Sequence, residues 1–490
     1  MTVARVVAVV GLLAAGCTSS GGTSSRSTQE PTSAPTTVPT TSTTSAVEAS
    51  PTTTEPVTAA INLLSLTRQE LLDLWAADRA AAVERIVEGG WGVRDNVLFG
   101  PSGLTFDLAR CPEGWSNDGP ADEGVVLGWW DAVHYGSGPS SANAYLAWLG
   151  AEATVAGQPI TLEASWPEVY EGDFHRDPAT SDAQENANRE LVADISDEVL
   201  AVVGFREWSQ NDGLRAHFDA ACLPSLGVLS NQAAEASPWW SPSLGLQVET
   251  EVVGWARYLQ EQFGDESAAV LVMDIEFGDR YLDSFSAALG SAATDRLVVQ
   301  RHRPDVVGID PQLAAIVEAD VDVLFLATAG SLCPQAITSL RNAGSNIPVV
   351  LPSICAGYGL LGPVFDQEGL WTIAGTYHSG VEDIANSTLG THAARNTEPG
   401  QRWFADDRDW LRTWQAVEIV KIADQLPGGL TRTNLALAAW SFHGRHPYAE
   451  HDITVEWAVD DIAIEQLRLL RFNPSTRLWE FTTHTYDGGR

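Results

Sequence analysis

Positive charge is scarce in this chain of 490 residues. Lysine occurs once, as Lys421, and Lys and Arg together number 28 against 64 Asp and Glu, which gives a formal net charge of -36. Such a surface repels phosphate backbones and anionic lipid headgroups. The composition therefore argues against nucleic acid as a partner, and it favours solubility, for example in a salty habitat, as the reason for the acidity.

The usual motifs of several enzyme classes are also missing. The chain has no G-x-S-x-G elbow, no H-E-x-x-H, no G-x-x-x-x-G-K-[ST] and no G-x-G-x-x-G at a strand-to-helix turn. A histidine cluster at residues 443–451 could supply three imidazoles and a carboxylate to zinc. Its spacing matches no zinc motif that we can justify, and Arg445 between glycine and histidine favours an ordinary loop. The sequence thus predicts no metal, no cofactor and no catalytic residue.

Long apolar runs are absent at the N-terminus, where residues 1–17 have the arrangement of a bacterial lipoprotein signal peptide. Arg5 is followed by a short apolar run at residues 6–15 and then by Gly16 and Cys17. The run is far shorter than the ~20 apolar residues of a membrane-spanning helix. The prediction is a signal that ends at Cys17, which becomes lipidated and anchors the protein on the extracytoplasmic face of the cell membrane. The alternative is a plain secretory signal that is cut nearby.

Bulky apolar residues are rare in the next segment, residues 18–60, which consists mainly of Ser, Thr, Pro, Gly and Ala. Such a composition cannot build a core and predicts a disordered linker. In residues 61–94 a capping-box spacing at Thr67 and Glu70 precedes apolar residues at helical intervals, which predicts a leading helix. The body that follows exceeds the ~250 to 300 residues of a single core, so two lobes are expected.

Short apolar runs alternate with amphipathic segments through this body, which predicts an α/β fold built on parallel sheets. Strands that are buried on both faces have such continuous apolar runs. The expected strands are residues 96–99, 160–163, 199–204, 226–230, 268–273, 297–301, 321–327, 349–351 and 370–374. The expected helices include residues 124–134, 184–192, 212–221, 250–263, 281–289, 311–318, 334–342 and 414–425.

Four cysteines remain besides Cys17, an even number in an oxidising compartment. Cys333 begins a predicted helix directly after a strand, and Cys355 follows the next strand, so both belong to one sheet edge and are expected to pair. Cys111 and Cys222 would then pair by elimination. Their predicted places, one after a strand and one before a strand, are at opposite sheet edges and count against that second bond.

The loops after the strands carry the candidate binding residues, because ligands of open parallel sheets bind beyond the carboxyl ends of the strands. The loop at residues 206–209 offers a cation, a carboxylate, an aromatic ring and a hydroxyl where a helix should begin. The ordinary interpretation of its first two residues is a solvated salt bridge. The candidates from all loops are Arg206, Glu207, Trp208, Ser209, Ser230, Asn231, Gln232, Phe277, Ser331 and Ser353.

The order of these segments resembles the type I periplasmic binding proteins, in the Leu/Ile/Val-binding group that serves ABC importers. The similar segments are residues 96–103, 157–162, 199–204, 224–230, 269–272, Phe277-Gly278, 320–325, 340–349 and 414–423. The resemblance implies a clamshell of two Rossmann-like lobes joined by three crossovers. One lobe would be residues 95–246 plus 378–452, and the other residues 247–377 plus 453–490. It also implies an insertion at residues 104–123, behind the first strand.

The resemblance further implies a protein without enzymatic activity that binds a small polar ligand and delivers it to an ABC permease. The ligand would lie near Trp208, Ser209, Ser230 to Gln232, Phe277, Ser331 and Ser353. Amino-acid binders of the family carry an acidic residue after the strand at 349–351, where this chain has Ser353. Glu207, Asp274 or Glu276 would then have to hold a ligand ammonium. The alternatives are an extracytoplasmic sensor or interaction module with the same fold, and a cell-surface hydrolase that uses Asp, Glu or the histidine cluster.

Overall fold

The computed structural model describes residues 62–488, apart from gaps at 120–124, 130–137, 165–177, 204–205, 208–213, 227–228, 231–238, 241, 243–245, 265–266, 291–293, 295, 305, 378–379, 397–406, 451–452, 455–463 and 465. Ile61–Arg490 forms one compact unit. The predicted signal peptide, Cys17 and the linker lie outside the described residues. Among the described helices, none is both long enough and apolar enough to cross a membrane.

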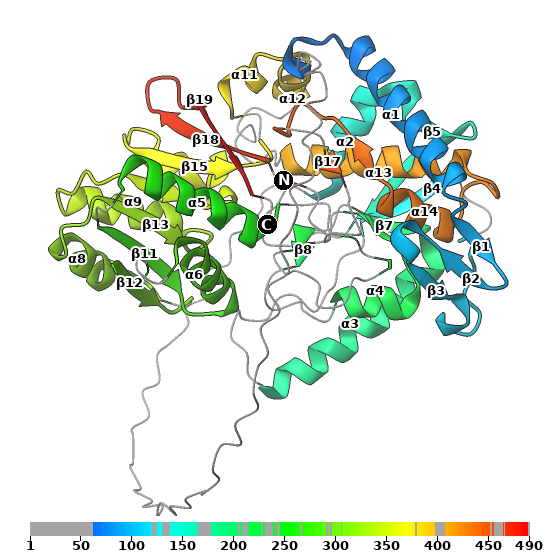
Figure 1. Ribbon diagram of the computed structural model, residues 1–490, viewed down its shortest axis with the longest axis horizontal. Helices are drawn as coiled ribbons and strands as arrows, with labels where there is room; N and C mark the ends of the chain where they lie inside the picture. The colour runs from blue at the N-terminus through cyan, green and yellow to red at the C-terminus, as the bar shows by residue number, and fades with distance from the viewer. Residues whose placement is uncertain are drawn as a thin grey trace, which may run out of the picture. The chain divides into compact units, whose positions relative to one another are not determined.

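A seven-stranded sheet forms one half of the architecture (Figure 1). Its order is β12 (Leu297–His302), β11 (Ala268–Met273), β13 (Val323–Ala327), β14 (Val349–Leu351), β15 (Leu370–Ala374), β18 (Gln466–Asn473) and β19 (Leu478–Asp487). The first five strands are parallel, and the last two extend the sheet as an antiparallel hairpin. The predicted strands of this region and the α/β class are confirmed.

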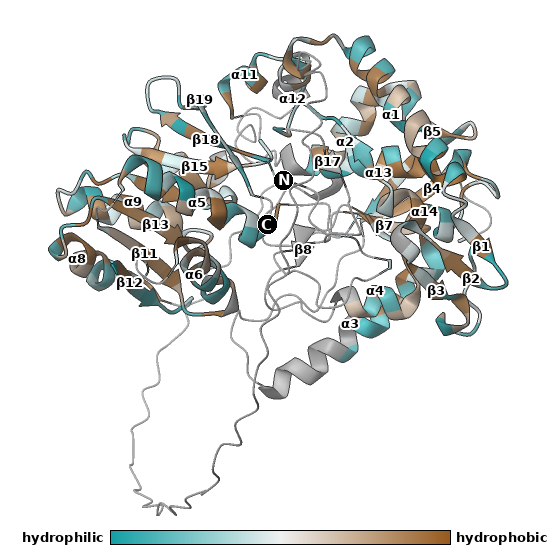
Figure 2. Ribbon diagram, viewed as in Figure 1, coloured by the Kyte–Doolittle hydropathy of each residue, from teal (hydrophilic) through white to brown (hydrophobic). Residues whose placement is uncertain are grey.

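Helices cover both faces of this sheet, which explains the continuous apolar runs of its strands. Alternate residues of β11 belong to different cores: Val270 packs with α5 (Val248–Gln262) and α6 (Glu276–Leu289), and Leu271 with α8 (Asp310–Glu318) and α9 (Leu332–Asn342). In Figure 2 the central strands are accordingly coloured as hydrophobic.

A five-stranded sheet has the order β5 (Thr154–Val155), β6 (Gln158–Ala164), β4 (Val125–Trp129), β7 (Ala201–Val203) and β9 (Ser225–Leu226). The helices that follow or contact its strands are α2 (Gly138–Leu149), α3 (Pro178–Glu198), α4 (Leu214–Ala221) and α13 (Asp407–Gln425), and α14 (Arg432–Trp440) packs on α13. Smaller helices are α10 (Tyr358–Leu361), α11 (Glu382–Ala385) and α12 (Thr388–Asn396). Short pairs join β8 (Arg206–Glu207) to β10 (Leu229–Ser230) and β16 (His443–Gly444) to β17 (Ile453–Thr454).

The predicted helix at residues 124–134 is wrong, because residues 125–129 form β4, whose five residues are all buried. An apolar run of this length does not distinguish a buried strand from a buried helix. The predicted first strand at 96–99 therefore does not belong to the parallel sheet. Its residues form β2 (Val97–Phe99) in an antiparallel sheet with β1 (Gly92–Arg94) and β3 (Thr105–Asp107). The segment 104–123 precedes the first parallel strand instead of interrupting the loop behind it.

The leading helix is α1 (Arg68–Glu88), and it begins with the predicted capping box. Thr67 accepts a hydrogen bond from the Glu70 N–H, and the Glu70 carboxylate accepts one from the Thr67 N–H at 2.8 Å. The two orphan donors of the first turn are thereby satisfied reciprocally. Trp75 anchors the helix, since its side chain is fully buried and its indole N–H donates to the Arg445 carbonyl at 2.6 Å.

Two disulfides are present, Cys333–Cys355 and Cys111–Cys222. The sequence-based objection to the second bond depended on placing Cys111 after a strand of the parallel sheet. Cys111 instead follows β3 of the small antiparallel sheet, and Cys222 follows α4. The opposite-edge argument therefore does not apply.

Candidate functional site

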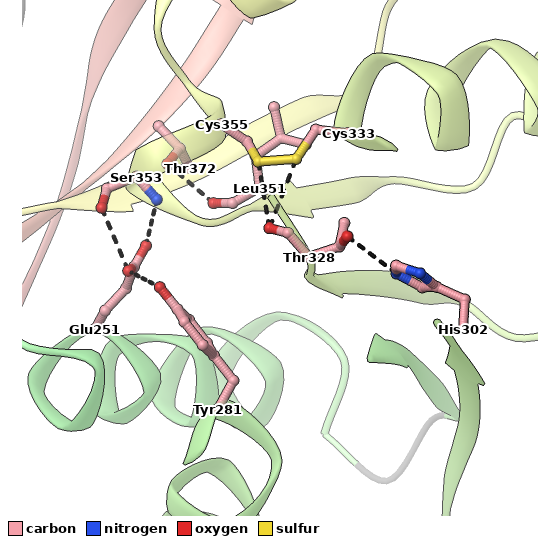
Figure 3. The surroundings of a disulfide bond; sticks show 9 residues. All are labelled: Glu251, Tyr281, His302, Thr328, Cys333, Leu351, Ser353, Cys355 and Thr372. Carbon is pink, nitrogen blue, oxygen red and sulfur yellow. Dashed lines mark hydrogen bonds between the residues drawn. A yellow bond between two sulfur atoms is a disulfide. The ribbon is translucent and has the colours of Figure 1, made fainter. Parts of the chain in front are cut away.

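Side chains from α5, α6, β12, α9 and the turn after β14 gather at the carboxyl edge of the seven-stranded sheet (Figure 3). Parallel strands end at the same edge, so the residues that follow β11, β12, β13 and β14 meet there. We call this region the carboxyl edge; it consists of Glu251, Phe277, Tyr281, His302, Thr328, Ser331, Ser353 and the Cys333–Cys355 disulfide. The disulfide ties the start of α9, after β13, to the end of η7 (Ser353–Cys355), the single 3-10 turn after β14.

Glu251 is the centre of the carboxyl edge. Its carboxylate accepts hydrogen bonds from the Tyr281 hydroxyl at 2.6 Å, the Ser353 backbone N–H at 2.5 Å and the Ser353 hydroxyl at 3.3 Å (Figure 3). The residue is only 2% exposed. A buried carboxylate is tolerated when such donors replace water, and hydrogen bonds to a charged acceptor are the stronger kind.

Tyr281 and Phe277 connect this carboxylate to the start of α6. Their rings lie 4.9 Å apart, one helical turn from each other, and both are buried. Burial, and next the neighbouring Glu251 charge, hold the pKa of Tyr281 well above its usual 10, so the phenol keeps its proton and remains a donor. Gly278 lets this turn lie against β11, because a Cβ there would be 2.0 Å from the Met273 carbonyl oxygen.

His302 and Thr328 form a second polar pair at the ends of β12 and β13. The His302 Nδ1 lies 3.0 Å from the Arg303 carbonyl oxygen, and Nε2 lies 3.0 Å from the Thr328 hydroxyl. A carbonyl can only accept, so Nδ1 carries the proton and Nε2 accepts from the hydroxyl. Burial lowers the pKa of His302 and keeps the ring neutral. The Thr328 hydroxyl is fully buried, so a substrate cannot reach it as hydrolysis by this pair would require.

The predicted binding residues fall into two groups. Phe277 and Ser353 are joined through Tyr281 and Glu251, and Ser331 is the exposed N-cap of α9 at the same edge. In the other group, the backbones of Arg206 and Glu207 in β8 pair with Leu229 and Ser230 in β10. Trp208, Ser209, Asn231 and Gln232 lie outside the described residues.

Sequence reasoning missed Glu251 and Tyr281. Glu251 interrupts the apolar stripe of α5 between Val248 and Trp255, at the helical spacing of the buried face, and a charge in such a stripe was the available signal. Of the residues proposed to hold an ammonium, Asp274 is exposed and pairs with Arg301 at 3.2 Å. The side chains of Glu207 and Glu276 are outside the described part of the chain.

The described part of the histidine cluster, residues 443–450, contacts α1. His446 is fully buried, stacks on Trp75 with 5.7 Å between ring centroids, and accepts the Tyr448 N–H at Nδ1. Arg445 forms an ion pair with Asp78 of α1. Burial lowers the pKa of His446 to about 3. Within the described ranges, no three His, Cys, Asp or Glu side chains are grouped as metal ligands would be.

Comparison with known proteins agrees with this fold. The model of the periplasmic binding protein family matches residues 135–379. A possible leucine/isoleucine/valine-binding protein from Rhodopirellula baltica is 14% identical, with a TM-score of 0.59 over 75% of this chain and 98% of that chain. A fatty acid ABC transporter substrate-binding protein from Thermomonospora curvata is 14% identical, with a TM-score of 0.60 over 77% and 96%.

A branched chain amino acid ABC transporter protein from Thermus thermophilus with bound valine is 15% identical, with a TM-score of 0.57 over 75% of this chain and 97% of that chain. No protein of curated function gave a significant match to the sequence. At these identities the similarity of the structures shows the fold alone. The family match covers residues 135–379, which are half of the chain.

Proposed function

We propose that this chain, which belongs to the type I periplasmic binding protein family, is an extracytoplasmic, lipid-anchored solute-binding protein of an ABC importer. Its role is to bind a small polar or amphiphilic molecule and to deliver it to a membrane permease. The ligand class is amino-acid-like or related, since the similar structures include a valine-bound protein and a fatty acid binder.

The observation that carries this proposal is the composition of the carboxyl edge. It combines buried aromatic rings with hydroxyl, backbone and carboxylate groups, at the place where parallel sheets bind their ligands. Ser331 offers an exposed hydroxyl after β13, the half-buried Ser353 follows β14, and the Phe277 ring, which is 3% exposed, lies in the first turn of α6 after β11. Binding without chemistry fits this set better than hydrolysis, because the His302–Thr328 pair is buried.

Two lobes are part of the proposal, with the boundaries expected from the sequence. All seven strands of the larger sheet come from residues 247–377 and 453–490. Two of the proposed crossover segments lie side by side, because the Tyr377 N–H donates to the Tyr448 carbonyl at 2.6 Å and the Glu450 N–H to the Gly375 carbonyl at 3.1 Å. Ligand contacts made with both lobes would drive a hinge closure.

A thermal-shift screen of the purified full chain tests the binding role. The panel contains L-amino acids, their amides, short peptides, sugars, fatty acids and aromatic acids. A ligand at 100 times its Kd should raise the free energy of unfolding by about 2.7 kcal/mol. A shift with one chemical class supports the proposal and names the ligand, whereas no shift across the panel contradicts import of these solutes.

The ligand contacts proposed outside the carboxyl edge are tested with Trp208→Ala. An aromatic side chain against the ligand should contribute about 1 to 2 kcal/mol, so the Kd of any hit should rise roughly tenfold without a change in melting temperature. Unchanged affinity would remove Trp208 from the site.

The anchor is tested with Cys17→Ser in a bacterial host. The unchanged chain should sediment with membranes and label with fatty acid, and the variant should not. A variant that is secreted and processed like the unchanged chain would favour the plain secretory signal.

A further inference from the structure

We propose that Glu251 is a positioning residue that holds the two ligand-contacting segments of the carboxyl edge, the first turn of α6 and the turn η7, in one fixed geometry. This inference rests on the proposed function, because it assigns ligand contacts to Phe277 and Ser353. In this proposal Glu251 acts through Phe277 and Ser353 and does not contact the ligand.

The bonds of Glu251 carry the inference. One carboxylate joins three elements: it belongs to α5, it accepts the phenol of α6, and it accepts the first N–H of η7 (Figure 3). The sequence separations are 30 residues to Tyr281 and 102 residues to Ser353, so the bonds link segments that the chain does not hold together locally. Ser353 donates both its backbone N–H and its hydroxyl, and the backbone N–H cannot rotate to follow a displaced carboxylate.

The consequence for the ligand follows from what each segment carries. Tyr281 lies one turn beyond Phe277 and contacts its ring, so the position of the phenol sets the position of the Phe277 ring. Ser353 begins η7, and Cys355, which ends it, is fixed by the disulfide to Cys333. The turn is therefore held at both of its ends, by the carboxylate at one and by sulfur at the other.

Two substitutions separate geometry from charge. In Glu251→Gln the amide oxygen still accepts the Ser353 N–H, and the amide nitrogen can donate to the Tyr281 oxygen, so positioning is retained and the charge is lost. In Glu251→Ala all three hydrogen bonds are lost. A positioning role predicts that glutamine rescues and alanine does not, whereas a direct electrostatic contact with a ligand ammonium predicts that both variants fail.

The experiment measures hydrogen exchange and binding on the full chain. Exchange of the segments around 276–285 and 352–361 should accelerate at least tenfold in Glu251→Ala and remain within about threefold of the unchanged chain in Glu251→Gln. Tyr281→Phe, which removes the phenol and keeps the ring, should accelerate only the first segment. Unchanged exchange in Glu251→Ala would overturn the inference.

Binding is measured with L-valine, L-isoleucine and decanoic acid as probes. For any probe that binds, Glu251→Ala should raise the Kd roughly tenfold or more and Glu251→Gln by about threefold at most. The matched control is Glu418→Ala, which removes an equally buried carboxylate from α13 and should leave the Kd unchanged. Equal affinity of Glu251→Ala and the unchanged chain, or equal loss with both Glu251 variants, contradicts positioning. If no probe binds the unchanged chain, the importer proposal for these solutes is contradicted, and the exchange result still decides the role of Glu251.

Discussion

Two buried carboxylates occupy two regions of this protein and are satisfied in different ways. Glu418 of α13 is 4% exposed and pairs with the Arg79 guanidinium of α1 at 2.6 Å. Glu251 of α5 is 2% exposed and accepts from a phenol and a backbone N–H. A flexible cationic side chain can follow its partner, whereas a backbone donor cannot. The first arrangement therefore attaches a helix, and the second fixes a turn.

The surroundings of the two carboxylates differ accordingly. Burial raises the pKa of Glu418, and the Arg79 charge opposes that rise without cancelling it. Glu418 lies on the same helix as Trp414, a member of an aromatic cluster. In this cluster the centroids of the Trp148, Trp414 and His446 rings lie within about 6 Å of the Trp75 ring, the range of favourable ring contacts. We expect changes in this cluster to affect the stability of the body, and changes at the carboxyl edge to affect binding.

Trp75→Ala should have the largest effect on stability. The side chain is fully buried and donates one hydrogen bond, so its removal should lower the free energy of unfolding by about 4 kcal/mol. Urea denaturation followed by tryptophan fluorescence measures the change. The Kd for a ligand, determined at a temperature where the variant is folded, should stay the same. A large change in Kd with a small change in stability would mean that Trp75 serves binding rather than the stability of the body.

Gly278→Ala should have the next largest effect, and it is expected at the carboxyl edge itself. The added Cβ would lie 2.0 Å from the Met273 carbonyl oxygen, which is backbone and cannot rotate away. Moving the first turn of α6 should cost about 2 to 3 kcal/mol and should also weaken binding, because Phe277 moves with that turn. The control is Gly357→Ala, where no atom lies within 4 Å of the added Cβ. Equal stability of the two variants would contradict the close approach.

Much of the sheet could be predicted from the sequence, because its strands are apolar on both faces and are bounded by turn residues. The predicted strands 268–273, 349–351 and 370–374 have the observed bounds. The segment at 124–134 was misassigned because more apolar residues follow Trp129 and extend the run to helical length. Burial gives a strand and a short helix the same composition, so only pairing partners distinguish them.

The candidate site could be predicted only in part. Phe277, Ser331 and Ser353 follow strands, and that position is visible in the sequence. The bond from Glu251 to Ser353 spans 102 residues and depends on how α5 packs against the sheet, which no local pattern encodes. For the same reason the sequence predicted an ordinary loop around His446 and could not show its burial against Trp75, which is a tertiary contact.

Two buried histidines, His446 in the aromatic cluster and His302 at the carboxyl edge, should make the stability depend on pH. We expect this effect to be the smallest of those considered. Burial lowers the pKa of His446 from its usual 6.5 to about 3, and it lowers that of His302 against the opposing hydrogen bond to Arg303 and the Asp274 charge. The unfolded chain then binds a proton first, so stability is complete above pH 6.5 and is lost as the pH falls from 6.5 toward 3. The His446 contribution should be about 1.4 kcal/mol per pH unit below pH 6.

Urea titrations between pH 5 and pH 7 test this assignment. Leucine at position 446 removes the titrating ring, so His446→Leu should flatten the dependence of stability on pH by roughly that slope, whatever its effect at pH 7. The matched variant His302→Leu should flatten it less, since the hydrogen bond to Arg303 and the Asp274 charge oppose the effect of burial on the His302 pKa, whereas burial acts on His446 unopposed. A larger flattening from His302→Leu would mean that proton-linked stability lies at the carboxyl edge. In that case we expect ligand affinity to depend on pH as well. Titration of His446 in the aromatic cluster alone would leave the affinity unchanged.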